Sequence, residues 1–289
     1  MKIEYKIEEV RPNVFAVIVK DHYHRAMLFC RVQEYYESPN PEFRGKTFSI
    51  WDYIEWYSRE HRDVFTYTYD WGGFNIPLKT AYNCYEKLRE YESPYDKEMD
   101  SIIRTIELKM FNKKNTRNWN AYIIGADSIE SDTFDHEICH GLYATNKEYK
   151  ALVDEITETI EWQDYLKFEK NLLDMGYTAA VIPDEIQAYL TTNYEYTKFS
   201  KGVSKKKCKA FHKEYKQSVD EITETIEWQD YLKFEKNLLD MGYTAAVIPD
   251  EIQAYLSTNY EYTKFSKGVS KKTLKQLSKE YQKVFNKYL

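Results

Sequence analysis

The chain is poor in glycine and proline, with 9 Gly and 7 Pro in 289 residues. This scarcity excludes collagen-like and Gly/Pro-rich low-complexity proteins. Long apolar runs are also missing, because the longest, residues 14–19 and 121–126, have the length of strands, whereas a membrane helix needs about 18 residues. The four cysteines are widely spaced, unlike the dense framework of a small disulfide-bonded secreted domain. No secretory signal opens the sequence, so we expect a cytoplasmic protein without a membrane span.

The charge balance is mildly acidic, with 47 Asp plus Glu against 41 Lys plus Arg and a net charge of −6. This balance argues against nucleic acid as the partner of the whole chain. Two lysine-rich stretches, residues 198–216 and 264–287, contain interspersed Glu and Tyr, which is typical of solvated helix faces. Because 43% of the residues are hydrophobic and 30% are charged, the composition indicates a globular protein rather than a disordered one.

Hydrophobic periodicity predicts an α+β fold that is mostly helical and contains a small mixed sheet. Strands are expected at residues 2–7, 14–20, 66–71 and 118–127, with a turn at residues 11–13. Helices are expected at residues 23–36, 49–59, 77–91 and 95–111, and a further helix carries His136.

The second half of the chain contains an internal duplication. Residues 153–206 recur as residues 219–272, and the two copies differ only at Thr191, which is Ser257 in the second copy. Solenoid repeats diverge and are more numerous, so this pair is typical of a recent tandem duplication. We therefore divide the chain into an α/β N-terminal region (1–117), a catalytic region (118–212) and a duplicated helical region (213–289).

Each copy is expected to contain the same elements. A long helix should end at the glycine of its Met-Gly-Tyr segment, and a second helix should open at the proline of its Ile-Pro-Asp segment. The positions are Gly176 and Pro183 in the first copy, and Gly242 and Pro249 in the second. Apolar spacing over residues 274–288 predicts a final amphipathic helix.

One segment carries a metal-binding pattern, His-Glu-x-x-His at residues 136–140. Residues four apart on a helix differ by about 40° around the axis, so His136 and His140 can share one Zn²⁺. Glu137 lies about 100° further round, beside the ligands, where a general base would take a proton from metal-bound water. Chance occurrence of the motif is rare with 6 His in the chain. The alternative is a surface helix with two unrelated histidines.

This segment resembles the active-site helix of zincin metallopeptidases. In that family an edge strand beside the helix holds the substrate backbone, and the strand expected at residues 118–127 immediately precedes this helix. Asn146 stands where a metzincin has its third histidine, so the resemblance is to gluzincins. Their third ligand is a Glu on a downstream helix.

Glu185 is the candidate for that third ligand. The Asp184-Glu185-x-x-Ala188 segment resembles the third-ligand helix of gluzincins, and its spacing from His136 is similar to that in the anthrax lethal factor peptidase domain. The alternative is an acidic first turn favoured by the helix dipole. The carboxylate that gluzincins carry further along this helix is missing, so the partner of the imidazole rings is not identified.

The duplication offers a second candidate, because Glu251 repeats Glu185 while the His pair is not repeated. Loop closure favours Glu185, the nearer residue, by a fraction of a kcal/mol. The second copy is then an appended helical module, or it exchanges with the first.

Four other residues could take part in chemistry. His22 and His24 are interpreted as a polar turn rather than a metal pair, and Cys139 as a core residue. Tyr177 precedes Glu185 and offers a hydroxyl to an oxyanion.

The resemblance implies a zinc-dependent hydrolase, a metallopeptidase whose substrate is a peptide or protein. His136, His140 and Glu185 would bind zinc, and Glu137 would be the base. The alternative function is a non-catalytic interaction protein with a structural or vestigial metal site. Residues 35–46 are similar to uncharacterised proteins of large viruses and phages, which makes the alternative a viral protein of the host cytoplasm.

Overall fold

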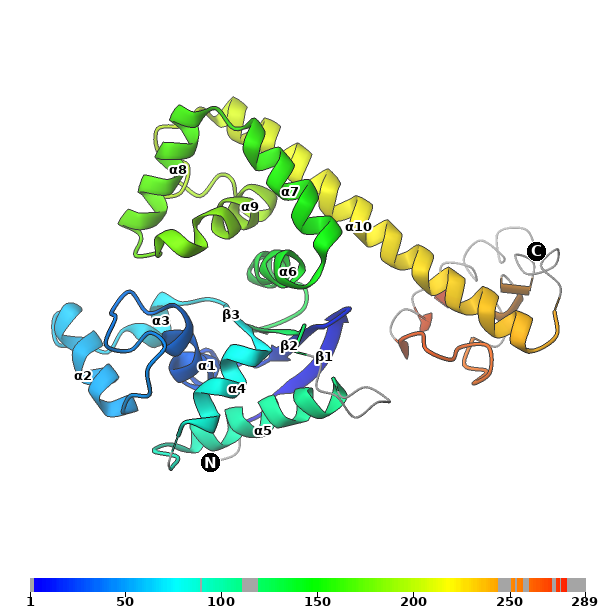
Figure 1. Cartoon of the computed structure of the whole chain (residues 1–289), viewed down its shortest axis with the longest axis horizontal. Helices are drawn as coiled ribbons and strands as arrows, with labels where there is room; N and C mark the ends of the chain where they lie inside the picture. The colour runs from blue at the N-terminus through cyan, green and yellow to red at the C-terminus, as the bar shows by residue number, and fades with distance from the viewer. Residues whose placement is uncertain are drawn as a thin grey trace. The chain divides into compact units, whose positions relative to one another are not determined.

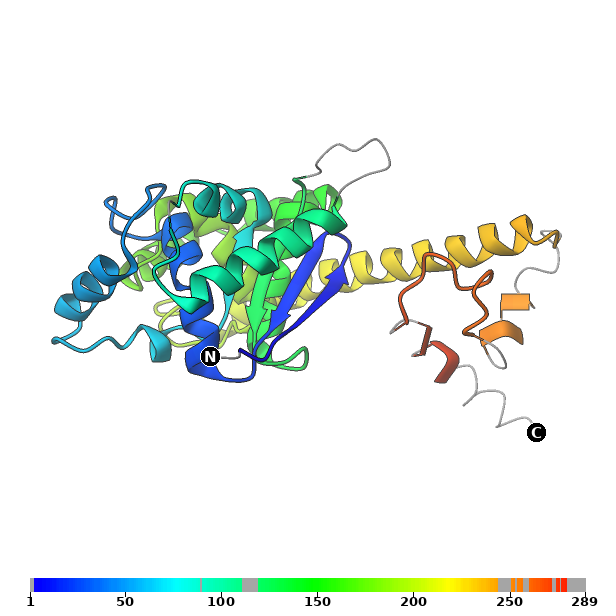
Figure 2. The same ribbon diagram turned by 90° about the horizontal axis from the view of Figure 1, so that it is seen from below.

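The computed structural model describes residues 3–88, 90–110, 119–243, 251–252, 254–256, 260–271, 274–275 and 277–279, with the backbone alone for residues 218–232. Contacts divide the chain into two compact units, Met1–Val219 and Asp220–Leu289. The first unit is mostly helical and contains a four-stranded mixed sheet (Figures 1 and 2), which confirms the α+β prediction.

The sheet has the strand order β1-β2-β4-β3. Its members are β1 (Lys6–Arg11), β2 (Val14–Ile18), β3 (Phe74–Pro77) and β4 (Tyr122–Ala126). β2 runs parallel to β4, while β1 and β3 are antiparallel edge strands. Every residue of β4 is buried, as expected for a central strand that is covered on both faces. Pro77 fits an edge strand, where its missing N–H costs no ladder bond.

One face of the sheet packs against α1 (His22–Glu37) and α5 (Pro94–Lys109). α1 begins at Asp21, whose side chain accepts a hydrogen bond from the His24 backbone N–H. A Cβ on Gly125 of β4 would lie 2.6 Å from the Phe29 ring of α1, so glycine permits this close approach. Three shorter helices complete this side: α2 (Ile50–Glu60), α3 (Tyr67–Asp70) and α4 (Leu78–Glu86).

The opposite face of the sheet carries α6 (Asp132–Thr145), seen above the strands in Figure 1. α6 approaches β2 so closely that a Cβ on Gly141 would lie 2.6 Å from Val14 Cγ1. The far side of α6 contacts α7 (Lys147–Thr159) and α9 (Ile182–Thr192). α8 (Trp162–Asp174) and the short 3₁₀ helix Ala179–Val181 connect these two helices. α6 is therefore enclosed between the sheet and α9.

Three expectations about the strands were wrong. The first strand was expected at residues 2–7, but β1 runs from Lys6 to Arg11 and includes the first residue of the expected turn. Residues 66–71 were expected to form a strand, but Tyr67–Asp70 form α3, which is closed by a Thr66 Oγ1 to Asp70 Oδ2 hydrogen bond of 2.6 Å. The strand begins instead after the glycine pair, at β3. The expected strand at 118–127 exists as β4, but it is central, and β3 is the edge strand beside α6.

The expected long helix ending at Gly176 is interrupted. The first copy forms α7 and α8, separated at Ile160, which is buried. The same sequence in the second copy lies within α10 (Lys205–Asp240), which is continuous. Identical local sequence cannot select between these forms, so tertiary packing selects them. Pro249 and residues 280–288 of the expected final helix lie outside the described residues, whereas residues 274, 275 and 277–279 are helical.

The second unit repeats the internal packing of the first copy. Phe234 stacks on Phe265 at 4.6 Å between ring centroids, matching 4.7 Å for Phe168 and Phe199. Asn237 Nδ2 donates to the Phe265 carbonyl at 2.7 Å, as Asn171 does to the Phe199 carbonyl. The duplicated sequence therefore forms the same small core twice.

Candidate metal centre

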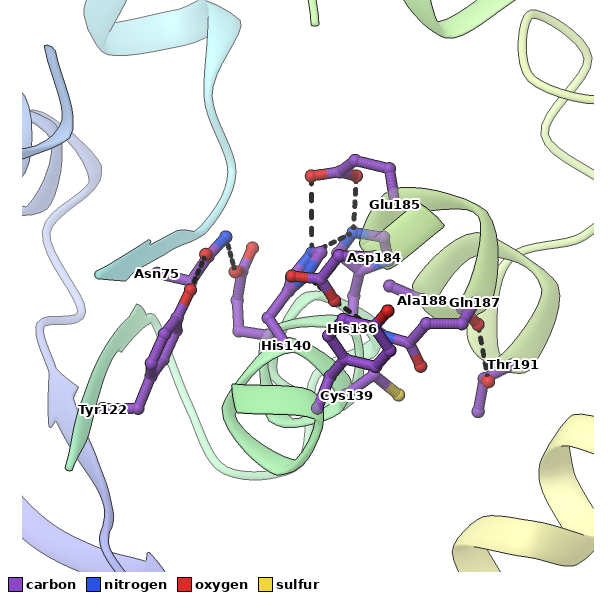
Figure 3. Close-up of polar contacts among 12 residues, drawn as sticks. Asn75, Tyr122, His136, Cys139, His140, Asp184, Glu185, Gln187, Ala188 and Thr191 are labelled. Carbon is purple, nitrogen blue, oxygen red and sulfur yellow. Dashed lines mark hydrogen bonds and ion pairs between the residues drawn. The ribbon is translucent and has the colours of Figure 1, made fainter. Parts of the chain in front are cut away.

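α6 presents the two histidines of the motif on one face. Ser131 caps the helix by accepting a hydrogen bond from the Phe134 backbone N–H. One turn of helix brings Nε2 of His136 within 3.3 Å of Nε2 of His140. His140 is 1% exposed. Two imidazole nitrogens therefore converge on one buried point, as Figure 3 shows.

α9 brings Glu185 to the same point. Pro183 occupies the first turn of α9, and Glu185 follows in that turn, buried at 3% exposure. Its carboxylate oxygens lie 3.7 Å from Nε2 of His136 and 3.6 Å from Nε2 of His140. The three ligand atoms lie within 4.8 Å of one another. These residues could hold a metal ion, and they form the one such group found among the described residues.

The donor set is chemically suited to a cation. Oε2 of Glu185 is buried and has no hydrogen-bond partner in the described part of the chain. A buried carboxylate oxygen without a partner is costly, and a bound cation would remove that cost. Burial tends to lower the pKa of His140, but the charges of Asp184 and Glu185 outweigh it and hold the pKa well above its ordinary value. The site therefore attracts positive charge.

The outer nitrogen of each imidazole lies close to an oxygen atom. Nδ1 of His140 lies 3.0 Å from Oδ1 of Asp184 in an ion-pair contact that lacks hydrogen-bond geometry, and Nδ1 of His136 lies within hydrogen-bond distance, 3.2 Å, of Oγ1 of Thr192. The Thr192 hydroxyl donates to the Ala188 carbonyl, so its oxygen is left to accept the Nδ1 proton. Both contacts keep Nε2 free to coordinate a metal. Sequence pattern alone did not reveal these two residues, although Asp184 adjoins Glu185 and Thr192 follows it by two turns of α9.

Glu137 is buried in the same helix, at 5% exposure. Its Oε2 accepts a hydrogen bond of 2.9 Å from Nδ2 of Asn75 in β3. Burial raises the pKa of Glu137 above its ordinary value, and the neighbouring histidines oppose the rise. Burial and the negative charge of Glu185 also raise the pKa of Glu37, near the end of α1. Two buried carboxyl groups, those of Glu137 and Glu185, thus lie at the centre, and the half-buried Glu37 is affected by their charge.

Glu251, the alternative third ligand, belongs to the second unit, while Glu185 is the residue that the structure brings to the His pair. The hydroxyl of Tyr177 lies 3.2 Å from that of Tyr189. The Tyr189 ring in turn packs against His136 at 4.8 Å between centroids. The tyrosine pair therefore forms one wall of the site.

Four further residues, Asn146, Cys139, His22 and His24, have structural roles. Asn146 accepts hydrogen bonds from two backbone N–H groups and so caps α7. Cys139 is buried, as expected for a core residue. His22 contacts Arg25, and His24 Nδ1 lies 2.7 Å from the Tyr95 hydroxyl.

Comparison of the sequence with protein-family models, with curated proteins and with solved structures found no match in any of the three. None of the described helices combines the length and the hydrophobicity needed to cross a bilayer.

Proposed function

We propose that this chain is a zinc-dependent hydrolase of peptide bonds, resembling the gluzincins. The observation that carries the proposal is the convergence of His136, His140 and Glu185 within 4.8 Å. Two imidazoles and one carboxylate form a ligand set typical of catalytic zinc, which keeps a fourth position for water or substrate. Imidazole also suits zinc better than the oxygen-preferring Mg²⁺ or Ca²⁺.

The chemistry divides among these residues. When bound, zinc supplies Lewis acidity that polarises a carbonyl and acidifies a water molecule. Glu137 takes the proton of the attacking water and passes it to the leaving amine, which is the work of a general base and then a general acid. Asp184 and Thr192 hold the imidazole rings so that each Nε2 faces the ligand position.

The proposal is tested by metal content and by turnover. Elemental analysis after dialysis should give one zinc per chain, and His136→Ala or His140→Ala should lose it. Glu137→Gln should keep zinc, while hydrolysis of a peptide library falls by roughly 10²-fold or more. A natively folded wild-type protein that cannot take up zinc would refute the proposal.

A non-catalytic interaction protein is the second candidate, favoured by the duplicated unit that repeats Glu185 without the His pair. In that case the site would hold structural zinc or be vestigial and hold none, and Glu137→Gln would change nothing measurable. For either function we place the protein in the cytoplasm, since all four cysteines are free and buried.

A further inference from the structure

β3 lies beside α6 and carries the hydrogen-bond donor that contacts the base. Asn75, at the middle of this edge strand, is 8% exposed and its amide Nδ2 lies 2.9 Å from Oε2 of Glu137. Figure 3 shows the Asn75 side chain between β4 and α6. A residue far away in sequence therefore fixes one oxygen of the Glu137 carboxylate.

The orientation of the Asn75 amide is itself fixed. The hydroxyl of Tyr122 in β4 donates to Oδ1 of Asn75 at 2.8 Å. Asn75 pairs with Ile124, two residues from Tyr122, so both side chains lie on the same face of the sheet. Turning the amide over would put Oδ1 against an ionised carboxylate, where neither group can donate. The acceptor-only carboxylate therefore selects the NH₂ end of the amide, and the Tyr122 hydroxyl holds the other end in place.

Gly73 provides the space on the other side of the carboxylate. A Cβ at this position would lie 2.3 Å from Oε1 of Glu137 and 2.6 Å from Cγ2 of Thr133. The preceding Gly72 has room, because a Cβ there would come no closer than 3.5 Å to Thr133. Neither glycine has a positive φ. Gly73 is therefore needed for space rather than for backbone conformation.

We propose that Asn75, oriented by Tyr122, is a positioning residue that holds the carboxylate of Glu137 in one rotamer for proton transfer. This inference rests on the proposed function. The Asn75 bond occupies Oε2 and leaves Oε1 as the oxygen that meets the water proton. Since a freely rotating Glu would spend little time in the reactive geometry, fixing it contributes to the rate rather than to substrate binding.

The test compares Asn75→Ala, Tyr122→Phe and Gly73→Ala with the matched control Gly72→Ala in the full-length protein. Zinc content, kcat and KM on a peptide substrate, and the affinity for acetohydroxamic acid are measured. Hydroxamates bind zinc and pass a proton to a neighbouring carboxylate, so they report the position of Glu137 without turnover. We expect Asn75→Ala and Gly73→Ala to keep zinc and KM, to lower kcat by about 10–100-fold, and to weaken hydroxamate binding about tenfold.

Tyr122→Phe keeps the ring and should give a smaller loss of the same kind, while Gly72→Ala should match the wild type. Circular dichroism and zinc content show that each variant is folded. Unchanged kcat and hydroxamate affinity in zinc-loaded Asn75→Ala would overturn the positioning role and leave the proposed function standing. Loss of zinc together with activity in Asn75→Ala would also overturn it, since the residue would then be structural. A wild type without zinc would remove both proposals.

Discussion

Oδ1 of Asp184 lies 3.0 Å from Nδ1 of His140, while the next residue, Glu185, faces Nε2 of the same ring. Two adjacent residues at the start of α9 therefore contact the two nitrogens of one imidazole ring. Such a carboxylate fixes the tautomer and the direction of the ring, and its loss typically costs 10–100-fold in metal affinity.

Asp184→Asn should accordingly weaken zinc binding by about 10–100-fold, measured by competition with a chelating dye. The duplication supplies a matched control, since Asp250 has the same sequence context. Asp250→Asn should leave zinc affinity unchanged. Equal effects of the two substitutions would contradict the assignment of Asp184.

Glu185 and Glu251 offer a second comparison within one chain. Glu185→Ala removes one of three ligands and should weaken zinc binding by more than Asp184→Asn does. Glu251→Ala should be silent, because Glu251 belongs to the second unit. Zinc titration of both variants and of the double variant decides the matter. If only the double variant loses zinc, the two copies exchange at the site.

The sequence predicted much of the site because its signal is local. Helical spacing is enough to place His136 and His140 on one face. The resemblance of the Asp184-Glu185-x-x-Ala188 segment to the third-ligand helix of gluzincins pointed to Glu185, with Glu251 left as the alternative. Asn75 and Tyr122 could not be found in this way. They reach Glu137 only through the pairing of β3 with β4, which connects residues far apart in the chain.

The duplication shows a limit of local sequence in the fold itself. Residues 153–174 form two helices, yet the same sequence at residues 219–240 is part of one continuous helix. In the first copy Ile160 is buried, and the Thr157 hydroxyl lies 2.7 Å from that of Tyr215. The break therefore depends on contacts made elsewhere in the chain. Similarly, α3 forms where a strand was expected at residues 66–71. The Thr66 hydroxyl donates a hydrogen bond to the Asp70 carboxylate and so closes a helical turn.

A buried carboxyl group away from the site gives a pH-dependent prediction. Burial raises the pKa of Glu34 from 4.5 to about 7, against the opposing effect of the nearby hydroxyls of Ser38, Tyr53 and Tyr67. The folded state therefore holds a proton that the unfolded state releases. The stability from this group is fully present below pH 4.5 and is lost as pH rises to about 7. Its contribution is about 3 kcal/mol.

Urea unfolding from pH 4.5 to 8 measures this effect. The neutral amide of Glu34→Gln needs no proton, so its free energy of unfolding should not show this loss. Relative to the wild type, it should rise by about 3 kcal/mol as pH increases across this range. Glu42→Gln, at an exposed position, should follow the wild type. A constant difference between Glu34→Gln and the wild type at every pH would show that Glu34 is ionised in the folded protein.

The close approach of α6 to β2 gives a final prediction. Alanine is a better helix former than glycine by about 1 kcal/mol, so Gly141→Ala would stabilise an isolated helix. In this fold the added Cβ would lie 2.6 Å from Cγ1 of Val14, which is fully buried. We expect a net loss of about 1–3 kcal/mol, because α6 must move away from the sheet.

A double-mutant cycle with Val14→Ala isolates the contact, since removing the Cγ atoms makes room for the new methyl group. The two substitutions should compensate each other by at least about 1 kcal/mol in urea unfolding. Ala144→Gly, at an exposed position of α6, measures helix propensity alone and should cost about 1 kcal/mol. If Gly141→Ala instead stabilises the protein by that amount, the close contact is wrong. Because His140 adjoins Gly141, zinc affinity should fall in Gly141→Ala and recover in the double variant.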